Sequence, residues 1–191
     1  IDLFVITKRG QLFTARLLIT LFLQLCGVRR HGRKVAGRFC LSFFIDDSDL
    51  SLGRIALSED YYLAFWIATL KPIVDDGVSL DFLNANLWVR DLLAFEAKIL
   101  PGKIRPRGLQ FFAFFEKWVR SWQLGRARAK MEGAGAEASL VVSKHMLKFH
   151  NLDRRELYRE SWISKYGSAR VEKQKFIKLF DMSKPITSQL T

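Results

Sequence analysis

The sequence predicts a mainly α-helical protein of six or seven amphipathic or apolar helices with extended basic termini. Three observations predict this class. Apolar residues recur at helical spacing along most of the chain, Pro and Gly end several of these runs, and strand-like patterns are confined to residues 1–7 and 38–45. The 191 residues are 49% hydrophobic and 13% aromatic, so the chain can bury a core and is not an intrinsically disordered polycation.

Charge divides the chain into three parts. Residues 1–45 form a basic arm with eight basic side chains and one acidic, residues 46–100 form an acidic helical centre, and residues 101–191 form a basic helical C-terminal half. The net charge is +12, from 31 Lys and Arg against 19 Asp and Glu. An acidic centre that folds against a basic end cancels only part of this excess. The remainder favours an anionic partner, which is phospholipid, RNA or an acidic protein subunit.

The first expected helix covers residues 11–28, an apolar run that is followed at once by four basic residues. Its charge-free part is short for a bilayer core of about 30 Å. Three interpretations stay open: a buried helix, an interfacial helix, or one short or tilted membrane span. A basic flank suits either membrane interpretation. The residues predicted to contact lipid or another anion here are Arg29, Arg30, Arg33 and Lys34.

Two helices are expected in the acidic centre. Ser58 is positioned to cap a helix over residues 61–70, which is apolar almost all round and contains Trp66. A helix without a polar face must be covered by its own core or by neighbouring subunits, so Trp66 is a predicted partner anchor. A longer helix is expected from Ser79 to about residue 100, where Pro and Gly end it.

Residues 109–124 contain the densest aromatic pattern and predict a helix with one aromatic stripe. Such a stripe suits a membrane interface, a protein interface or a core helix, and rings beside basic residues also stack on RNA bases. The predicted interfacial anchors are Phe111, Phe115, Trp118 and Trp122. The predicted anion-contacting residues are Lys117 and Arg120, together with Arg126 and Arg128 in the Ala- and Gly-rich stretch that follows.

Three further helices are expected near the C-terminus, over residues 139–150, from Asp153 to about residue 165, and over residues 171–182. The spacing of apolar and charged residues in each stretch favours an amphipathic helix. The remaining tail after Pro185 is polar and is expected to be extended.

No catalytic, cofactor or metal signature is present in the sequence. It lacks the Gly-rich nucleotide loops and the nucleophile elbow. His145 and His150 are five residues apart, which is a poor spacing for two metal ligands on one helix. The cysteines, Cys26 and Cys40, lie in apolar runs and are expected to be buried thiols rather than a disulfide or redox pair. We therefore expect no enzyme activity, no cofactor, no metal and no small-molecule substrate.

Together these features predict a structural accessory subunit of a large membrane-bound assembly of the respiratory-complex or ATP-synthase type. Its expected location is the mitochondrial inner membrane, and its expected partners are other subunits and anionic phospholipid such as cardiolipin. The alternative is an RNA-binding structural protein of an organellar ribosome. The chain begins at Ile1 rather than Met, which indicates either a processed amino terminus or a missing start.

Overall fold

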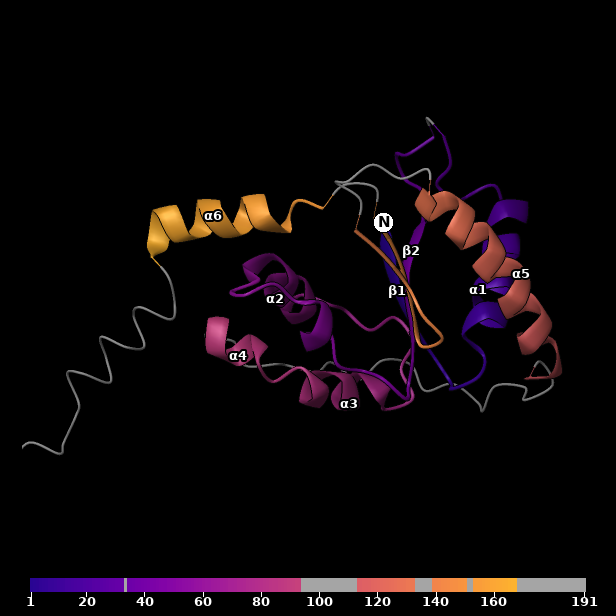
Figure 1. Cartoon of the computed structure of the whole chain (residues 1–191), viewed down its shortest axis with the longest axis horizontal. Helices are drawn as coiled ribbons and strands as arrows, with labels where there is room; N and C mark the ends of the chain where they lie inside the picture. Colours follow the sequence, from indigo (N-terminus) through magenta and orange to yellow (C-terminus); the bar gives the residue numbers. More distant parts are fainter. Residues whose placement is uncertain (33, 94–112, 133–138, 151–152, 168–191) are drawn as a thin grey trace, which may run out of the picture. The chain divides into compact units, whose positions relative to one another are not determined.

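The computed structural model describes residues 1–32, 34–93, 113–132, 139–150 and 153–167 (Figure 1). Within these ranges the protein is α/β, with a mixed sheet of four strands, so the prediction of a mainly α class is wrong. The chain forms two compact units. The sheet unit contains residues 1–52, 71–86 and 98–153, and the helical unit contains residues 53–70, 87–97 and 154–191.

The sheet unit begins with a β-α-β arrangement. Strand β1 (Asp2–Thr7) and strand β2 (Cys40–Asp46) are parallel, and helix α1 (Leu12–Leu25) connects them. Parallel strands require such a crossover, because a tight turn cannot return the chain to the same end of the sheet. The two strand-like stretches at residues 1–7 and 38–45 are thereby confirmed as strands.

The other two strands form a hairpin where the sequence predicted a helix. Strands β3 (Ser139–Val142) and β4 (Met146–His150) are antiparallel, and β4 pairs with β2, giving the order β1-β2-β4-β3. The backbone N–H of Ser143 donates to the carbonyl of Met146 at 2.8 Å and closes the turn. The helix prediction over residues 139–150 is therefore wrong. Two short apolar runs beside a Ser-Lys turn fit two strands as well as one helix, and pairing with β2 decides between them.

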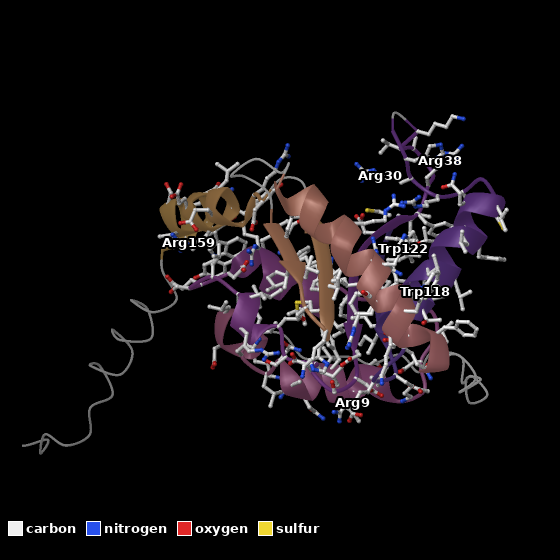
Figure 2. The ribbon with its side chains drawn as sticks, turned by 45° about the vertical axis from the view of Figure 1, so that its right-hand side comes forward. Arg9, Arg30, Arg38, Trp118, Trp122 and Arg159 are labelled. Carbon is white, nitrogen blue, oxygen red and sulfur yellow. The ribbon has the colours of Figure 1, made fainter. Side chains whose placement is uncertain are left out.

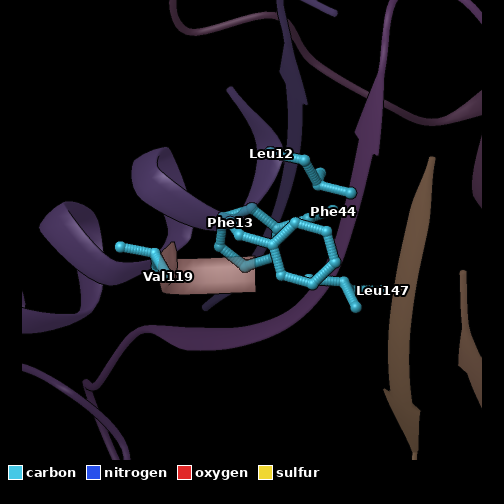
Figure 3. Packing of buried hydrophobic residues seen from close by; sticks show 5 residues of the cluster. All are labelled: Leu12, Phe13, Phe44, Val119 and Leu147. Carbon is cyan, nitrogen blue, oxygen red and sulfur yellow. The ribbon is translucent and has the colours of Figure 1, made fainter. Parts of the chain in front are cut away.

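Two helices cover one face of the sheet. Helix α5 (Ala113–Glu132) contacts α1, and both pack on the sheet. The helix predicted at residues 11–28 is confirmed as α1, although it ends at Leu25. The helix predicted at residues 109–124 is confirmed from Ala113 and continues beyond residue 124, whereas residues 109–112 lie outside the described ranges. None of the helices in the described ranges combines the length and the apolar character that crossing a membrane requires. Figure 3 shows the core between helices and sheet, which consists of Leu12, Phe13, Phe44, Val119 and Leu147.

The helix predicted from Ser79 to residue 100 is shorter than expected. Helix α3 (Val78–Ala85) ends at Asn86, whose Oδ1 accepts the backbone N–H of Leu52 at 2.8 Å. The side-chain amide of Asn86 donates to the carbonyl of Leu50 at 2.9 Å. These bonds to a remote loop replace continued helix. A second short helix, α4 (Val89–Leu92), follows in the helical unit, and residues 94–112 lie outside the described ranges.

The helical unit contains a 3-10 turn (Gly53–Ile55) and helices α2 (Tyr61–Ala68), α4 and α6 (Arg155–Tyr166). The prediction that Ser58 caps α2 is wrong. The fully buried Asp60 accepts the backbone N–H of Leu63 at 2.9 Å and contacts Nη1 of Arg155 at 3.2 Å, so it also joins α6 to α2. The rings of Tyr61 and Trp162 stack at 5.1 Å. The helix predicted at 153–165 is confirmed, and the one predicted at 171–182 lies outside the described residues.

Candidate docking surface

Helix α5 turns its polar side inward and its aromatic side outward. Glu116, Val119 and Gln123 recur at helical spacing and are buried. Trp118 is 71% exposed, and Phe115 and Trp122 are also exposed. Figure 2 labels Trp118 and Trp122 beside α5. The aromatic stripe predicted from the sequence therefore exists, but it does not form the core. We call Phe115, Trp118 and Trp122 the α5 stripe.

The inward position of Glu116 follows from the start of α1. The residue before that helix is Gln11, whose side chain makes no capping bond, and the first turn of α1 contains no acidic residue. Glu116 supplies both functions from α5. Its Oε1 accepts the backbone N–H of Phe13 at 2.9 Å, and its Oε2 accepts that of Thr14 at 2.8 Å. A carboxylate is favourable here because the N–H groups and the dipole of a helix N-terminus are positive.

Gln123 makes the second polar contact between the two helices. Its amide donates to the carbonyl of Phe13 at 2.8 Å, and its Oε1 accepts from Nη1 of Arg16 at 2.6 Å. The guanidinium of Arg16 also lies over the ring of Phe149 at 4.6 Å. Burial, together with the positive charges of Arg29 and Arg126, lowers the pKa of Arg16 to about 10. These contacts fix α5 in the orientation that leaves its stripe in solvent.

The predicted anion-contacting residues of α5 lie at different angles around the helix. The guanidinium of Arg126 lies over the ring of Trp122 at 5.2 Å, beside the α5 stripe. Lys117 and Arg120 are exposed and lie about 100° and about 160° around the helix from Trp118. Arg120 is therefore on the opposite flank. Phe111 is outside the described residues, as is the side chain of Arg128.

Helix α1 has a second exposed apolar stripe. Its members recur at helical spacing, and the last of them, Leu25, is 87% exposed. The other side of α1 packs in the core through Leu12, Phe13 and Leu23. The helix is therefore apolar on both sides, although only one side is covered by the described residues. The α1 stripe consists of Leu18, Leu21, Phe22 and Leu25.

A basic loop connects α1 to β2. The backbone N–H of Arg30 donates to the carbonyl of Phe39 at 2.9 Å, and the N–H of Phe39 donates to the carbonyl of Val28 at 2.9 Å. The guanidinium of Arg38 donates to the carbonyl of Gly27 near the end of α1. Figure 2 labels Arg30 and Arg38 in this region. The basic loop consists of Arg29, Arg30, Lys34 and Arg38, whereas the predicted Arg33 lies outside the described residues.

The structure brings several predicted residues into one unit and leaves one apart. The α5 stripe, Lys117, Arg126 and the basic loop belong to the sheet unit. Trp66 is half-buried on α2, which belongs to the helical unit. An interfacial helix over residues 11–28 was one of the alternatives that the sequence left open, but the residues of the α1 stripe were not identified from the sequence.

A polar cluster that the sequence did not reveal lies where β2 ends. The ring nitrogen Nδ1 of His145 lies 2.9 Å from Oδ2 of Asp46 and 3.0 Å from Oγ of Ser48. The hydroxyl of Ser48 donates to Oδ1 of Asp46 at 2.5 Å. A Ser-His-Asp relay needs the two ring nitrogens to serve Ser and Asp separately, whereas here one nitrogen faces both. The cluster therefore ties the hairpin turn to β2, and 99 residues of separation hid it.

An exposed network of ion pairs lies at the same end of the sheet, where β1 and β2 end. The ammonium of Lys8 lies 3.2 Å from Oδ2 of Asp47 and 3.3 Å from Oδ2 of Asp76. The hydrogen bond to Asp47, which has the largest effect, and the one to Asp76 raise the pKa of Lys8. The acidic side chains are thus paired within the unit. Among the residues that the structure describes, no three His, Cys, Asp or Glu side chains are grouped to hold a metal ion.

Cys26 and Cys40 are free thiols, and Cys26 is exposed rather than buried as expected.

Comparison of the chain with protein-family models, with curated proteins and with solved structures finds no match. The functional argument therefore rests on the two stripes and the basic loop.

Proposed function

We propose that this chain is a non-catalytic accessory subunit of a larger membrane-bound assembly, held in place by the α1 and α5 stripes. The observation that carries the proposal is the orientation of α5, which buries Glu116 and Gln123 and exposes Trp118. The bonds of Glu116 and Gln123 fix this orientation within the chain, and the exposed tryptophan forfeits the free energy of burial. A partner that covers the α5 stripe would recover that free energy.

The composition of the α5 stripe supports a docking role. Trp and Arg are enriched among the residues that dominate binding energy at protein interfaces, and here Arg126 lies over Trp122. Contiguous exposed apolar patches mark interaction sites in soluble chains. The α1 stripe adds a second such surface on a helix that contacts α5.

Disruption of the α5 stripe tests the proposal. Full-length chain with Trp118→Ser and Trp122→Ser is expressed in the source cells, and its co-migration with a large complex is followed on native gels after mild detergent extraction. We expect the double variant to leave the complex, whereas Phe65→Ser, which removes an exposed aromatic ring from α2, remains bound. A wild-type chain that migrates alone from membrane extracts contradicts the proposal.

The location in the mitochondrial inner membrane stays a prediction, as does the type of assembly, a respiratory complex or an ATP synthase. The identity of the co-migrating subunits tests both. The RNA-binding alternative makes a different prediction for the same extract. Exposed rings beside Arg126 can stack on bases, so a ribosomal protein would sediment with ribosomal subunits in detergent and be released by high salt.

A further inference from the structure

We infer that the α1 stripe and the basic loop bind the surface of an anionic lipid bilayer, with α1 lying in the plane of the headgroups. This inference rests on the proposed function, since it names the partner of one of the two docking stripes. It assigns that partner to lipid and leaves the α5 stripe to other subunits.

The α1 stripe is short and lies on one side of its helix. Leu18 and Leu25 mark the ends of the α1 stripe, which extends over about 10 Å along the helix axis. None of the described helices is long and apolar enough to cross a bilayer, and the opposite face of α1 is already packed on the sheet unit. An apolar stripe on one side of a packed helix suits shallow insertion at the boundary between headgroups and acyl chains.

The charges around α1 also favour an anionic surface. Residues 3–45, which include α1 and the basic loop, contain no Asp or Glu. The stripe therefore has no carboxylate of its own element to repel lipid phosphates, and the cations of the basic loop begin four residues after Leu25. Basic clusters directly beside an apolar interfacial helix bind anionic headgroups.

The basic loop has a defined conformation. The backbone groups of His31 and Lys34 exchange hydrogen bonds at 3.3 and 3.0 Å, and Gly32 adopts a φ of +50° between them. The loop is also bonded to Val28 and Gly27 at the end of α1. The exposed Arg30 and Lys34 are thereby presented beside the C-terminal end of the α1 stripe.

The chemistry of the α1 stripe favours lipid over a protein or RNA. Its four side chains are three leucines and a phenylalanine, which carry no hydrogen-bonding group. Interface cores between proteins are enriched in Tyr, Trp, Phe, Met and Arg. Leucine, which supplies three of these four side chains, is under-represented among the residues that dominate binding energy. RNA recognition requires stacking rings and hydrogen bonds, and leucine supplies neither. Acyl chains require only apolar area.

Vesicle flotation with the full chain tests this inference. We expect binding to vesicles of equal parts phosphatidylcholine and phosphatidylglycerol, none to phosphatidylcholine alone, and weaker binding at high salt. Each cation near such a surface contributes about fivefold in affinity, so Arg30→Gln with Lys34→Gln lowers the affinity by about 25-fold. Phe22→Ser with Leu25→Ser also lowers it, because the apolar contact is lost.

The matched control removes the same charge from exposed positions outside the basic loop, by Lys71→Gln with Arg90→Gln, and should bind as the wild type does within about twofold. Thermal unfolding verifies that every variant is folded. Equal binding to both kinds of vesicle, equal loss in the control, or tighter binding to an oligouridine than to anionic vesicles overturns the inference. If vesicle binding fails while the wild-type chain still co-migrates with a complex on native gels, the lipid assignment is wrong and the accessory role stands. If the wild-type chain binds vesicles but migrates alone, the accessory role is contradicted.

Discussion

The carboxylate of Glu116 accepts the backbone N–H of Phe13 at 2.9 Å across 103 residues of sequence, so the N-terminus of α1 is capped from another helix. Most helices are capped by a residue directly before them. This contact determines which side of α5 faces the sheet unit, and it consequently determines which side is left for a partner.

Removal of this cap should destabilise the protein more than its position on a surface helix indicates. We expect Glu116→Ala to lower the free energy of unfolding by about 2–3 kcal/mol, because two backbone N–H groups lose a charged acceptor. Glu116→Gln should cost less, since its amide oxygen still accepts one bond. Urea denaturation measures both. The neighbouring exposed Lys117→Ala should change the value by no more than about 0.5 kcal/mol, and an equal loss in that control would contradict the assigned role.

Two adjacent residues of α5 test its orientation directly. Val119 is 3% exposed in the core, whereas Trp118 points to solvent. Val119→Ala should lower the free energy of unfolding by about 2 kcal/mol through loss of buried volume. Trp118→Ser should leave it within about 0.5 kcal/mol, although it removes a far larger side chain. Chemical denaturation of the isolated chain gives both values, and the reverse order would show that α5 is rotated by about 100° from this orientation.

Asp75 gives stability a measurable pH dependence. Burial raises its pKa, but hydrogen bonds from the Ser79 hydroxyl and from the N–H groups of Ser79, Gly77 and Asp76 outweigh burial, so its pKa lies below the ordinary 3.8. The stabilisation of the folded state by the charged Asp75 carboxylate is therefore present above pH 3.8. It is lost as the pH falls through the lower pKa that Asp75 has in the folded state. Asp75→Asn should reduce the free energy of unfolding by about 1 kcal/mol near neutral pH, as the loss of a cap does.

The difference between wild type and Asp75→Asn should shrink in acid. Unfolding curves at neutral pH and below pH 3.8 measure it. A difference that stays constant over this range would show that the charge of Asp75 makes no contribution.

Arg16 should act in the same direction as Asp75, but at high pH. Its folded pKa of about 10 lies below the ordinary value for a guanidinium, so the unfolded chain binds the proton more tightly. Stability from this group therefore rises as the pH increases through 10. Relative to Arg16→Gln, the wild type should gain about 1 kcal/mol between pH 9 and pH 11. Parallel denaturation of the two chains cancels the titration of the other basic groups, and an unchanged difference would contradict the desolvation of Arg16.

Local pattern predicted the positions of most elements, and remote contacts decided the rest. The helix periodicity at residues 11–28 and 109–124 and the apolar run at 38–45 were sufficient for α1, α5 and β2. The hairpin over residues 139–150 depends on β2 as a pairing partner, which no local window contains. Asn86 ends α3 through a loop more than 30 residues earlier.

The docking surface was predicted in part. The aromatic residues of the α5 stripe were recognised from spacing alone, because position on a helix follows from sequence. Their outward direction was not predictable, since it depends on the bonds of Glu116 and Gln123 to the first turn of α1. The ordinary preference for apolar burial predicts the wrong side of α5.

The order of the strands has a consequence for synthesis of the chain. Strand β2 lies between β1 and β4, and Phe44 pairs with Val5 on one side and Leu147 on the other. At roughly 5–20 residues per second, about 100 further residues occupy a ribosome for roughly 5–20 s before β4 emerges. During this interval the edge of β2 that later pairs with β4 is open in the nascent β-α-β segment. Cotranslational folding of the sheet unit must therefore wait for the hairpin, and chaperone dependence of the nascent chain is the expected result.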